Sequence, residues 1–221
     1  MQSIVPELFV SDLDRTHINP DLVIEGFKRV YRPLGLDADD LEYQVKHAEE
    51  LGVSYNVLDH VKSYGSSALV EEVKAMFLED CQTNPITYSD SEELFQYLDS
   101  IFMPNILITK GEYTFQELKL KGSALDKRPY QIIDTDYKGK LIAGWQTISG
   151  LFLPPVEVID LASRSVDLLD DKNKSFRGLP TSCKGIKIDR LGERALVSQR
   201  GYLDPRIIVI HSFREIPDYI N

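Results

Sequence analysis

The chain has 221 residues, of which 43% are hydrophobic and 27% charged, and its formal net charge at pH 7 is −10. That apolar content suffices for a sizeable core, as one α/β domain or a domain with a modest insertion, and it excludes a disordered chain. A pI near 4.9 argues against a nucleic-acid-binding surface, which needs clustered lysine and arginine.

The two cysteines, Cys81 and Cys183, form no disulfide framework and have no metal-type spacing. The first residues lack the basic and apolar regions of a signal peptide, and no apolar run approaches the roughly 20 residues of a membrane helix. We therefore expect a soluble, cytoplasmic protein with no membrane partner.

The first predicted element is a buried strand over 8–10, which ends at two carboxylates, Asp12 and Asp14. Residues two apart on an extended chain point to the same side, and open α/β sheets bind ligands just beyond the carboxyl ends of their strands. Two close carboxylates repel each other unless a cation neutralises them or one holds a proton. The alternative is an Asp-rich turn that caps the next helix.

Residues from about 20 to 84 contain no convincing strand and several amphipathic stretches. Their apolar spacing predicts helices over 21–31, 38–51, 55–60 and 67–81. The simplest account is a helical insertion between the first and second strands of a sheet. This divides the chain into an α/β core, 1–19 and 85–221, and a helical domain, 20–84.

The rest of the chain alternates between short β-branched runs and helical patterns. We predict strands over 106–108, 131–133, 156–159 and 206–210, a weaker strand over 185–189, and helices over 91–102 and from 115 to 120. Such alternation predicts a parallel sheet with right-handed crossovers. The expected fold class is α/β, a three-layer Rossmann-like core with an inserted helical domain.

Four polar positions at the predicted strand ends resemble the motifs of the haloacid dehalogenase superfamily, mostly phosphatases with an aspartyl nucleophile. Asp12-Leu13-Asp14-Arg15-Thr16 resembles the first motif, and Thr109, with Lys110 beside it, is similar to the second. Lys138 resembles the lysine of the third motif and Asp160 the metal-binding Asp of the fourth. The stretch from Thr109 to Leu125 also resembles the corresponding helix of members that carry a helical (C1-type) cap.

The resemblance implies a role for each of these residues. Asp12 would attack phosphorus, and Asp14 would serve as acid and then base. Thr109, Lys110 and Lys138 would bind the phosphoryl group. Mg²⁺ would bridge Asp12, the backbone carbonyl of Asp14, and Asp160. Lys140 is the alternative to Lys138 as the third-motif lysine.

Two positions depart from the family pattern. The family usually has a small residue, commonly Gly, after the second Asp, and here it is Arg15. The fourth motif usually has a second acid beside or soon after the first, whereas the next acid after Asp160 is Asp167, about two helical turns further on. Residues 170–176, on this reading, form a solvated helix end and loop. His17, close behind the first motif, is expected to be held by a local hydrogen bond, the alternative being a place in the pocket lining.

The sequence thus predicts a Mg²⁺-dependent phosphatase that acts on a small phosphorylated metabolite, with the helical cap closing over the substrate. Because the fourth motif departs from the pattern, the alternative is a catalytically weak or inactive relative with a binding or regulatory role. A phosphomutase is a further alternative. A dehalogenase is disfavoured because its chemistry does not need Asp14.

Overall fold

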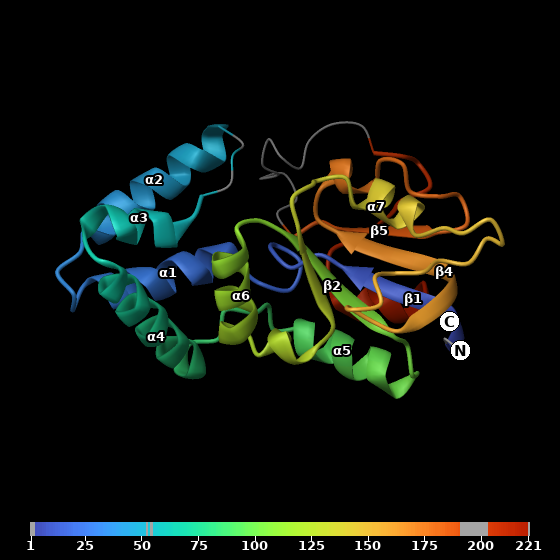
Figure 1. Cartoon of the computed structure of the whole chain (residues 1–221), viewed down its shortest axis with the longest axis horizontal. Coiled ribbons are helices and arrows are strands. Elements are labelled where there is room, and N and C mark those ends of the chain that lie inside the picture. The colour runs from blue at the N-terminus through green and yellow to red at the C-terminus, as the bar shows by residue number, and fades with distance from the viewer. Residues whose placement is uncertain (1–2, 52, 54, 191–202, 221) are drawn as a thin grey trace. The chain divides into compact units, whose positions relative to one another are not determined.

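The computed structural model describes residues 3–51, 53, 55–190 and 203–220, and the chain in it divides into two compact units (Figure 1). The sheet unit comprises Met1–His17, Tyr88–Lys110 and Arg128–Asn221. The helical unit comprises Ile18–Thr87 and Gly111–Lys127. The sequence-based division placed residues 111–127 in the core, whereas the structure groups them with the helices.

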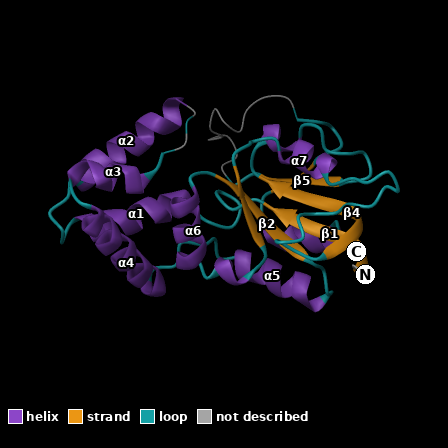
Figure 2. Ribbon diagram, viewed as in Figure 1, coloured by secondary structure: helices purple, strands orange, loops and turns teal. Residues whose placement is uncertain are grey.

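The sheet unit is built on a six-stranded parallel sheet within the described residues, in the order β3-β2-β1-β4-β5-β6 (Figure 2). The strands are β1 (Ser3–Ser11), β2 (Asn105–Lys110), β3 (Tyr130–Ile133), β4 (Leu161–Asp170), β5 (Lys184–Ile188) and β6 (Ile208–Ile210). The predicted parallel α/β sheet is confirmed, including the weaker strand near 185. The first strand in sequence lies at the centre of the sheet, between β2 and β4.

Helices cover both faces of this sheet. One face packs under α7 (Lys138–Gly144), where Leu8 and Val10 join a core cluster with Ile142 and Trp145. Phe9, between Leu8 and Val10 in the strand, points to the other face, on which α5 (Ser91–Ser100) lies (Figure 1). The sheet unit also contains the short 3₁₀ helices η2 (Asn173–Phe176) and η5 (Phe213–Asp218). This alternation gives the continuously apolar run of β1 its two-sided burial.

The strand predicted over 156–159 does not form. Pro154 and Pro155 precede it, and the amides of Val158 and Ile159 both donate to the carbonyl of Pro155, 2.9 and 3.1 Å away, which makes a turn. The strand that pairs with β1 is β4, which begins one residue after Asp160. Its register runs from Ser3 opposite Leu161 to Ser11 opposite Leu169.

The helical unit contains α1 (Pro20–Tyr31), α2 (Ala38–Leu51), α3 (Val57–Tyr64), α4 (Ser67–Thr83), α6 (Tyr113–Gly122) and the short η1 (Leu125–Lys127). Its core includes the stacked rings of Phe27 and Phe77, whose centroids lie 4.2 Å apart. Asn19 caps α1 by accepting a hydrogen bond from the amide of Asp21. The helices predicted over 21–31, 38–51 and 67–81 are confirmed.

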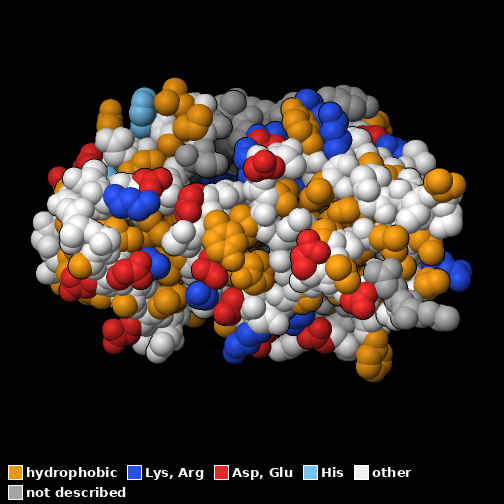
Figure 3. Space-filling model, viewed as in Figure 1, with side chains coloured by type: hydrophobic (Ala, Val, Ile, Leu, Met, Phe, Trp, Pro, Cys, Tyr) orange, Lys and Arg blue, Asp and Glu red, His pale blue; other side chains and the backbone are white. Residues whose placement is uncertain are grey.

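Among the described residues, no helix has the length and apolar character that a membrane crossing requires. On the face seen in Figure 3, acidic and basic side chains are interspersed.

Candidate functional site

Three buried carboxylates meet at the carboxyl end of the central strands. One oxygen atom from each of Asp12, Asp170 and Asp171 lies within 4.8 Å of the other two, and all three residues are at most 2% exposed. The register explains the meeting: Ser11 pairs with Leu169, so the residues that follow each strand emerge side by side. The amide of Asp12 also donates to the carbonyl of Leu169, 2.9 Å away.

Lys138 connects two of these carboxylates. Its Nζ donates to Oδ1 of Asp12 and to Oδ2 of Asp170, each 2.5 Å away. Lys138 is the first residue of α7. The next residue, Gly139, lets this end of the helix pack against the backbone at Leu179, because a Cβ on residue 139 would lie 2.8 Å from the backbone nitrogen of Leu179. Lys140 is instead exposed, with its ammonium 5.0 Å from the ring centre of Tyr137.

The electrostatics of the cluster favour a further cation. Burial is the main effect that raises the pKa of Asp12, and Asp170 adds to it while Lys138 opposes it. Burial alone would lower the pKa of Lys138, but Asp12 and Asp170 hold it above its ordinary value. Oδ2 of Asp12 accepts no hydrogen bond from any described residue. A buried, crowded and incompletely bonded set of carboxylate oxygens has the donor chemistry of a Mg²⁺ site.

The second-motif residues lie at the same edge of the sheet. Leu107 of β2 pairs with Ser11 of β1, so Thr109 lies beyond the end of β1, where it is 1% exposed. The Nζ of Lys110 donates to Oδ2 of Asp136, 2.8 Å away. Asp136 also pairs with Lys174 at 2.9 Å. Of the residues predicted for the site, the structure thus brings Asp12 and Lys138 into direct contact.

Asp14 and Arg15 form the turn after Asp12. Asp14 is partly buried, and Arg15 has a φ of 60°, in the left-handed region that favours glycine. The structure therefore gives a physical reason for the glycine that the resembled family carries here. In this chain an arginine adopts the same backbone conformation.

Asp160 is not part of the cluster, and its assignment as a metal ligand is corrected. It is exposed and precedes the amino end of β4, whereas Asp170 ends the same strand ten residues later. A strand rises about 3.3 Å per residue, so the two residues are separated by roughly 30 Å. The assignment depended on the strand over 156–159, which does not form.

Asp170 and Asp171 were missed because residues 170–176 were interpreted as a solvated helix end and loop. Both are buried, and Asp170 also accepts a hydrogen bond from the amide of Lys172, 2.8 Å away. The available signal was the pair of adjacent acids directly after the apolar residues Val166, Leu168 and Leu169. Asp170 and Asp171 also match the fourth-motif pattern of two neighbouring acids, whereas Asp160 has no second acid close by.

No protein-family model matches the sequence, and no curated protein matches it. Solved structures do match. A protein named as a haloacid dehalogenase-like hydrolase, from Burkholderia xenovorans LB400, is 15% identical with a TM-score of 0.66, covering 97% of this chain and 96% of its own. The HAD-hydrolase YfnB from Bacillus subtilis, bound to magnesium, is 12% identical with a TM-score of 0.57, covering 98% and 99%.

A third similar structure is CbbY from Rhodobacter sphaeroides in complex with phosphate, which is 11% identical with a TM-score of 0.53 and covers 98% of this chain and 96% of its own. These matches span nearly the whole of both chains in each case. At these identities, the matches show the fold alone. The chain therefore has the haloacid dehalogenase-like fold.

Proposed function

We propose that the protein is a Mg²⁺-dependent phosphatase that hydrolyses a small phosphorylated metabolite through an aspartyl-phosphate intermediate. The observation that carries this proposal is the buried cluster of Asp12, Asp170 and Asp171, with Lys138 bonded into it, at the carboxyl end of the central strand. Ligands of open α/β sheets bind at this edge.

Asp12, Asp170 and Asp171 are the residues that would hold the Mg²⁺ ion, together with the backbone carbonyl of Asp14. Carboxylate and carbonyl oxygens suit a hard cation, and the oxygen of Asp12 without a hydrogen bond supports this fit. Bound there, Mg²⁺ supplies the positive charge that lets an anionic phosphate approach a carboxylate.

The protein side chains account for the two chemical steps. An oxygen of Asp12 attacks phosphorus and forms an acyl phosphate, while the alkoxide leaves with a proton from Asp14. Water then attacks the same phosphorus and gives a proton to Asp14 while the bond between phosphorus and Asp12 breaks, which releases inorganic phosphate and restores Asp12 as a carboxylate and Asp14 as the protonated acid. Lys138 stabilises the negative charge on the phosphoryl oxygens, and Thr109, at the same edge of the sheet, donates a hydrogen bond to one of them.

The alternative of an inactive binding or regulatory relative is less well supported than the sequence indicated. That alternative depended on a fourth motif without a second acid. The structure has two adjacent acids, Asp170 and Asp171, in contact with the strand that carries Asp12. The magnesium and phosphate named with two of the similar structures support the phosphatase proposal in the same direction. The helical unit is the candidate cap that selects the substrate.

The test is hydrolysis of 4-nitrophenyl phosphate with and without Mg²⁺, by the wild-type protein and by Asp12→Asn. We expect Mg²⁺-dependent turnover in the wild type and none in the variant, because an amide is a poor nucleophile toward phosphorus. Circular dichroism and thermal unfolding of the variant verify that its fold is intact. Turnover of Asp12→Asn within a few-fold of wild type would contradict the aspartyl-phosphate mechanism.

A further inference from the structure

A hydrogen-bonded network holds the segment Asp12–His17, here called the catalytic loop, from the face of the sheet opposite α7. Its first member is His17, which is fully buried and stacks on Phe95, with ring centres 4.6 Å apart. Nε2 of His17 lies 2.9 Å from the hydroxyl of Ser11, and Nδ1 lies 3.2 Å from that of Ser91. His17 thus joins both ends of the loop to the start of α5.

The bonding pattern defines the state of this histidine. Burial is the main effect that lowers the pKa of His17 to about 3, so the ring is neutral at ordinary pH. Because the hydroxyl of Ser91 donates to the carbonyl of His17, 3.1 Å away, it can only accept at Nδ1. The ring is therefore the Nδ1–H tautomer, and Ser11 donates to Nε2. The expectation of a locally hydrogen-bonded histidine is confirmed.

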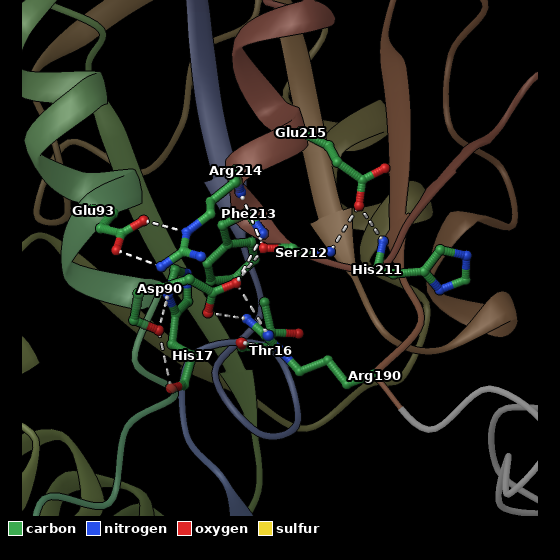
Figure 4. Close-up of polar contacts among 11 residues, drawn as sticks. Thr16, His17, Asp90, Glu93, Arg190, His211, Ser212, Phe213, Arg214 and Glu215 are labelled. Atoms are coloured by element: carbon green, nitrogen blue, oxygen red, sulfur yellow. Dashed lines mark hydrogen bonds and ion pairs between the residues drawn. The ribbon is translucent and has the colours of Figure 1, made fainter.

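Arg190 holds the loop more directly. Its Nε donates to the carbonyl oxygen of Thr16, 3.1 Å away, and its two terminal nitrogens donate to Asp90 at 2.9 and 3.3 Å (Figure 4). The guanidinium lies over the rings of Tyr88 and Phe213, 3.9 and 4.4 Å from their centres. The five N–H groups of a guanidinium have a fixed geometry. Because Asp90 and the two rings hold the guanidinium of Arg190, its bond to Thr16 fixes the position of the Thr16 carbonyl.

Asp90 is in turn fixed by the C-terminal part of the sheet unit. Its Oδ2 accepts from the hydroxyl of Ser212 at 3.0 Å and from the amide of Phe213 at 2.9 Å (Figure 4). Burial would raise the pKa of Asp90, but the bonds from Arg190, Phe213 and Ser212 outweigh it and hold the pKa below its ordinary value. Asp90 is therefore a buried, charged anchor for Arg190.

We propose that Arg190 is a positioning residue for Asp14, acting through the Thr16 carbonyl and anchored by Asp90. Thr16 is two residues after Asp14, and the residue between them, Arg15, has the left-handed backbone that makes the turn. Loss of the bond to Thr16 frees the end of this turn and with it the direction of the Asp14 carboxyl. Asp12 is held separately, by β4 and Lys138. This inference depends on the role of Asp14 in the proposed function.

The distinguishing test uses leaving-group basicity. Phenyl phosphate needs a proton for its leaving group, whereas 4-nitrophenyl phosphate, whose leaving group is much less basic, needs it far less. If Arg190 positions Asp14, Arg190→Gln lowers kcat on phenyl phosphate by roughly tenfold or more, since general acid catalysis contributes about 10²–10⁴-fold. On 4-nitrophenyl phosphate the loss is only a few-fold.

Arg214 provides the matched control. It makes a two-bond ion pair with Glu93, 2.8 and 2.9 Å, close to the network but exposed to solvent (Figure 4). Arg214→Gln should leave kcat on both esters unchanged, because exposed pairs contribute little. Equal losses on the two esters in Arg190→Gln would overturn the positioning role, since general destabilisation lowers both rates together. Asp90→Asn, which keeps the side-chain size, is the second variant if Arg190→Gln does not fold.

A readout without turnover separates this inference from the proposed function. The amide of His17 donates to the carbonyl of Leu13, 2.9 Å away, inside the loop. Arg190→Gln should accelerate hydrogen–deuterium exchange of this amide, and Arg214→Gln should not. Unchanged exchange in Arg190→Gln overturns the proposal. Absence of wild-type hydrolysis on both esters instead counts against the phosphatase, and the exchange result then decides the loop-holding role alone.

Discussion

Strands β1 and β4 carry two pairs of acids, each bridged by one lysine. At the carboxyl end of the strands, Lys138 joins Asp12 to Asp170. About halfway along the two strands, Nζ of Lys184 lies 3.1 Å from Oε1 of Glu7 and 3.7 Å from Oδ2 of Asp167. The side chains of Asp170 and Asp167 are both fully buried. Each site combines one lysine with two acids, and the two sites differ in their place on the strands.

The end site has a third carboxylate, Asp171, and a loop that leads away from the sheet. At the mid-sheet site Asp167 is fully buried and lies beside Phe9 in the register, whereas the side chain of Lys184 is 44% exposed. Burial, followed by repulsion from Glu7, raises the pKa of Asp167 to about 8. Its charge is thus disfavoured by its surroundings. A strand end can gather carboxylates for a cation, whereas burial inside the sheet raises the pKa of Asp167 and favours its neutral form.

The largest change should come from breaking the end site at Lys138. Lys138→Met removes the ammonium between two buried carboxylates, which costs about 3 to 5 kcal/mol of unfolding free energy in the metal-free protein. We also expect kcat to fall by about 10²–10³, because charge stabilisation on the phosphoryl group is lost. Urea unfolding and steady-state kinetics measure the two effects. Lys140→Met, at an exposed position on the same helix, is the control and should change neither.

The two ends of β4 give the second test. Asp170→Asn should raise the Mg²⁺ midpoint of activity by at least about tenfold, since even outer-shell changes around metals cost that much. It should also remove the rise in melting temperature that Mg²⁺ produces without substrate. Asp160→Asn should leave both measurements at their wild-type values. A shift with Asp160→Asn and none with Asp170→Asn would reverse our assignment.

The raised pKa of Asp167 at the mid-sheet site should make the unfolding free energy depend on pH. The folded state keeps a proton on Asp167 up to about pH 8, whereas the unfolded chain releases it near the ordinary aspartate value. The folded state therefore binds more protons across this window, and its stability falls as pH rises through it. In Asp167→Asn this contribution disappears, so the loss of unfolding free energy between about pH 5 and about pH 8 becomes smaller. An unchanged pH slope in urea titrations would argue against a protonated Asp167.

The smallest effect concerns Arg15, in the turn that follows Asp12 and Asp14. Arg15→Gly should be more stable than Arg15→Ala by about 1 kcal/mol, because glycine adopts a positive φ without the cost of a Cβ. Arg15→Ala removes the same side chain but keeps the Cβ. The difference in melting temperature between these variants isolates the backbone term. If Arg15→Gly is no more stable than Arg15→Ala, the backbone of Arg15 carries no strain.

The first strand and its acids were predictable because the signal is local. Residues 8–10 form an apolar run, and Asp12 follows at once. The strand β4 lacks such a signal, since Ser163 and Asp167 are polar yet fully buried within it. The run at 156–159 has the better composition but follows two prolines and folds as a turn. The residue pattern therefore favours the wrong segment as the strand, and with it Asp160 in place of Asp170 as the fourth-motif residue.

The membership of α6 was not predictable for a different reason. In the sequence, residues 113–122 follow β2 as an ordinary crossover helix does. In the structure, Phe115 packs near Phe27, with ring centres 6.0 Å apart, and a Cβ at Gly122 would lie 3.0 Å from the sulfur of Cys81. Both partners are in the helical unit. Such contacts join residues far apart in sequence, and no local pattern encodes them.

The register of the central strand also has a consequence for biosynthesis. β1 is made before β4, its main partner, because Ser3 pairs with Leu161 and Ser11 with Leu169, far apart in sequence. Contacts of such long sequence separation form slowly, while the helices between 18 and 87 can form from nearby residues. We therefore expect the nascent chain to acquire helical structure early and to carry β1 without its main partner until β4 has been made. The cluster of Asp12, Asp170 and Asp171 would come together only at that stage of synthesis.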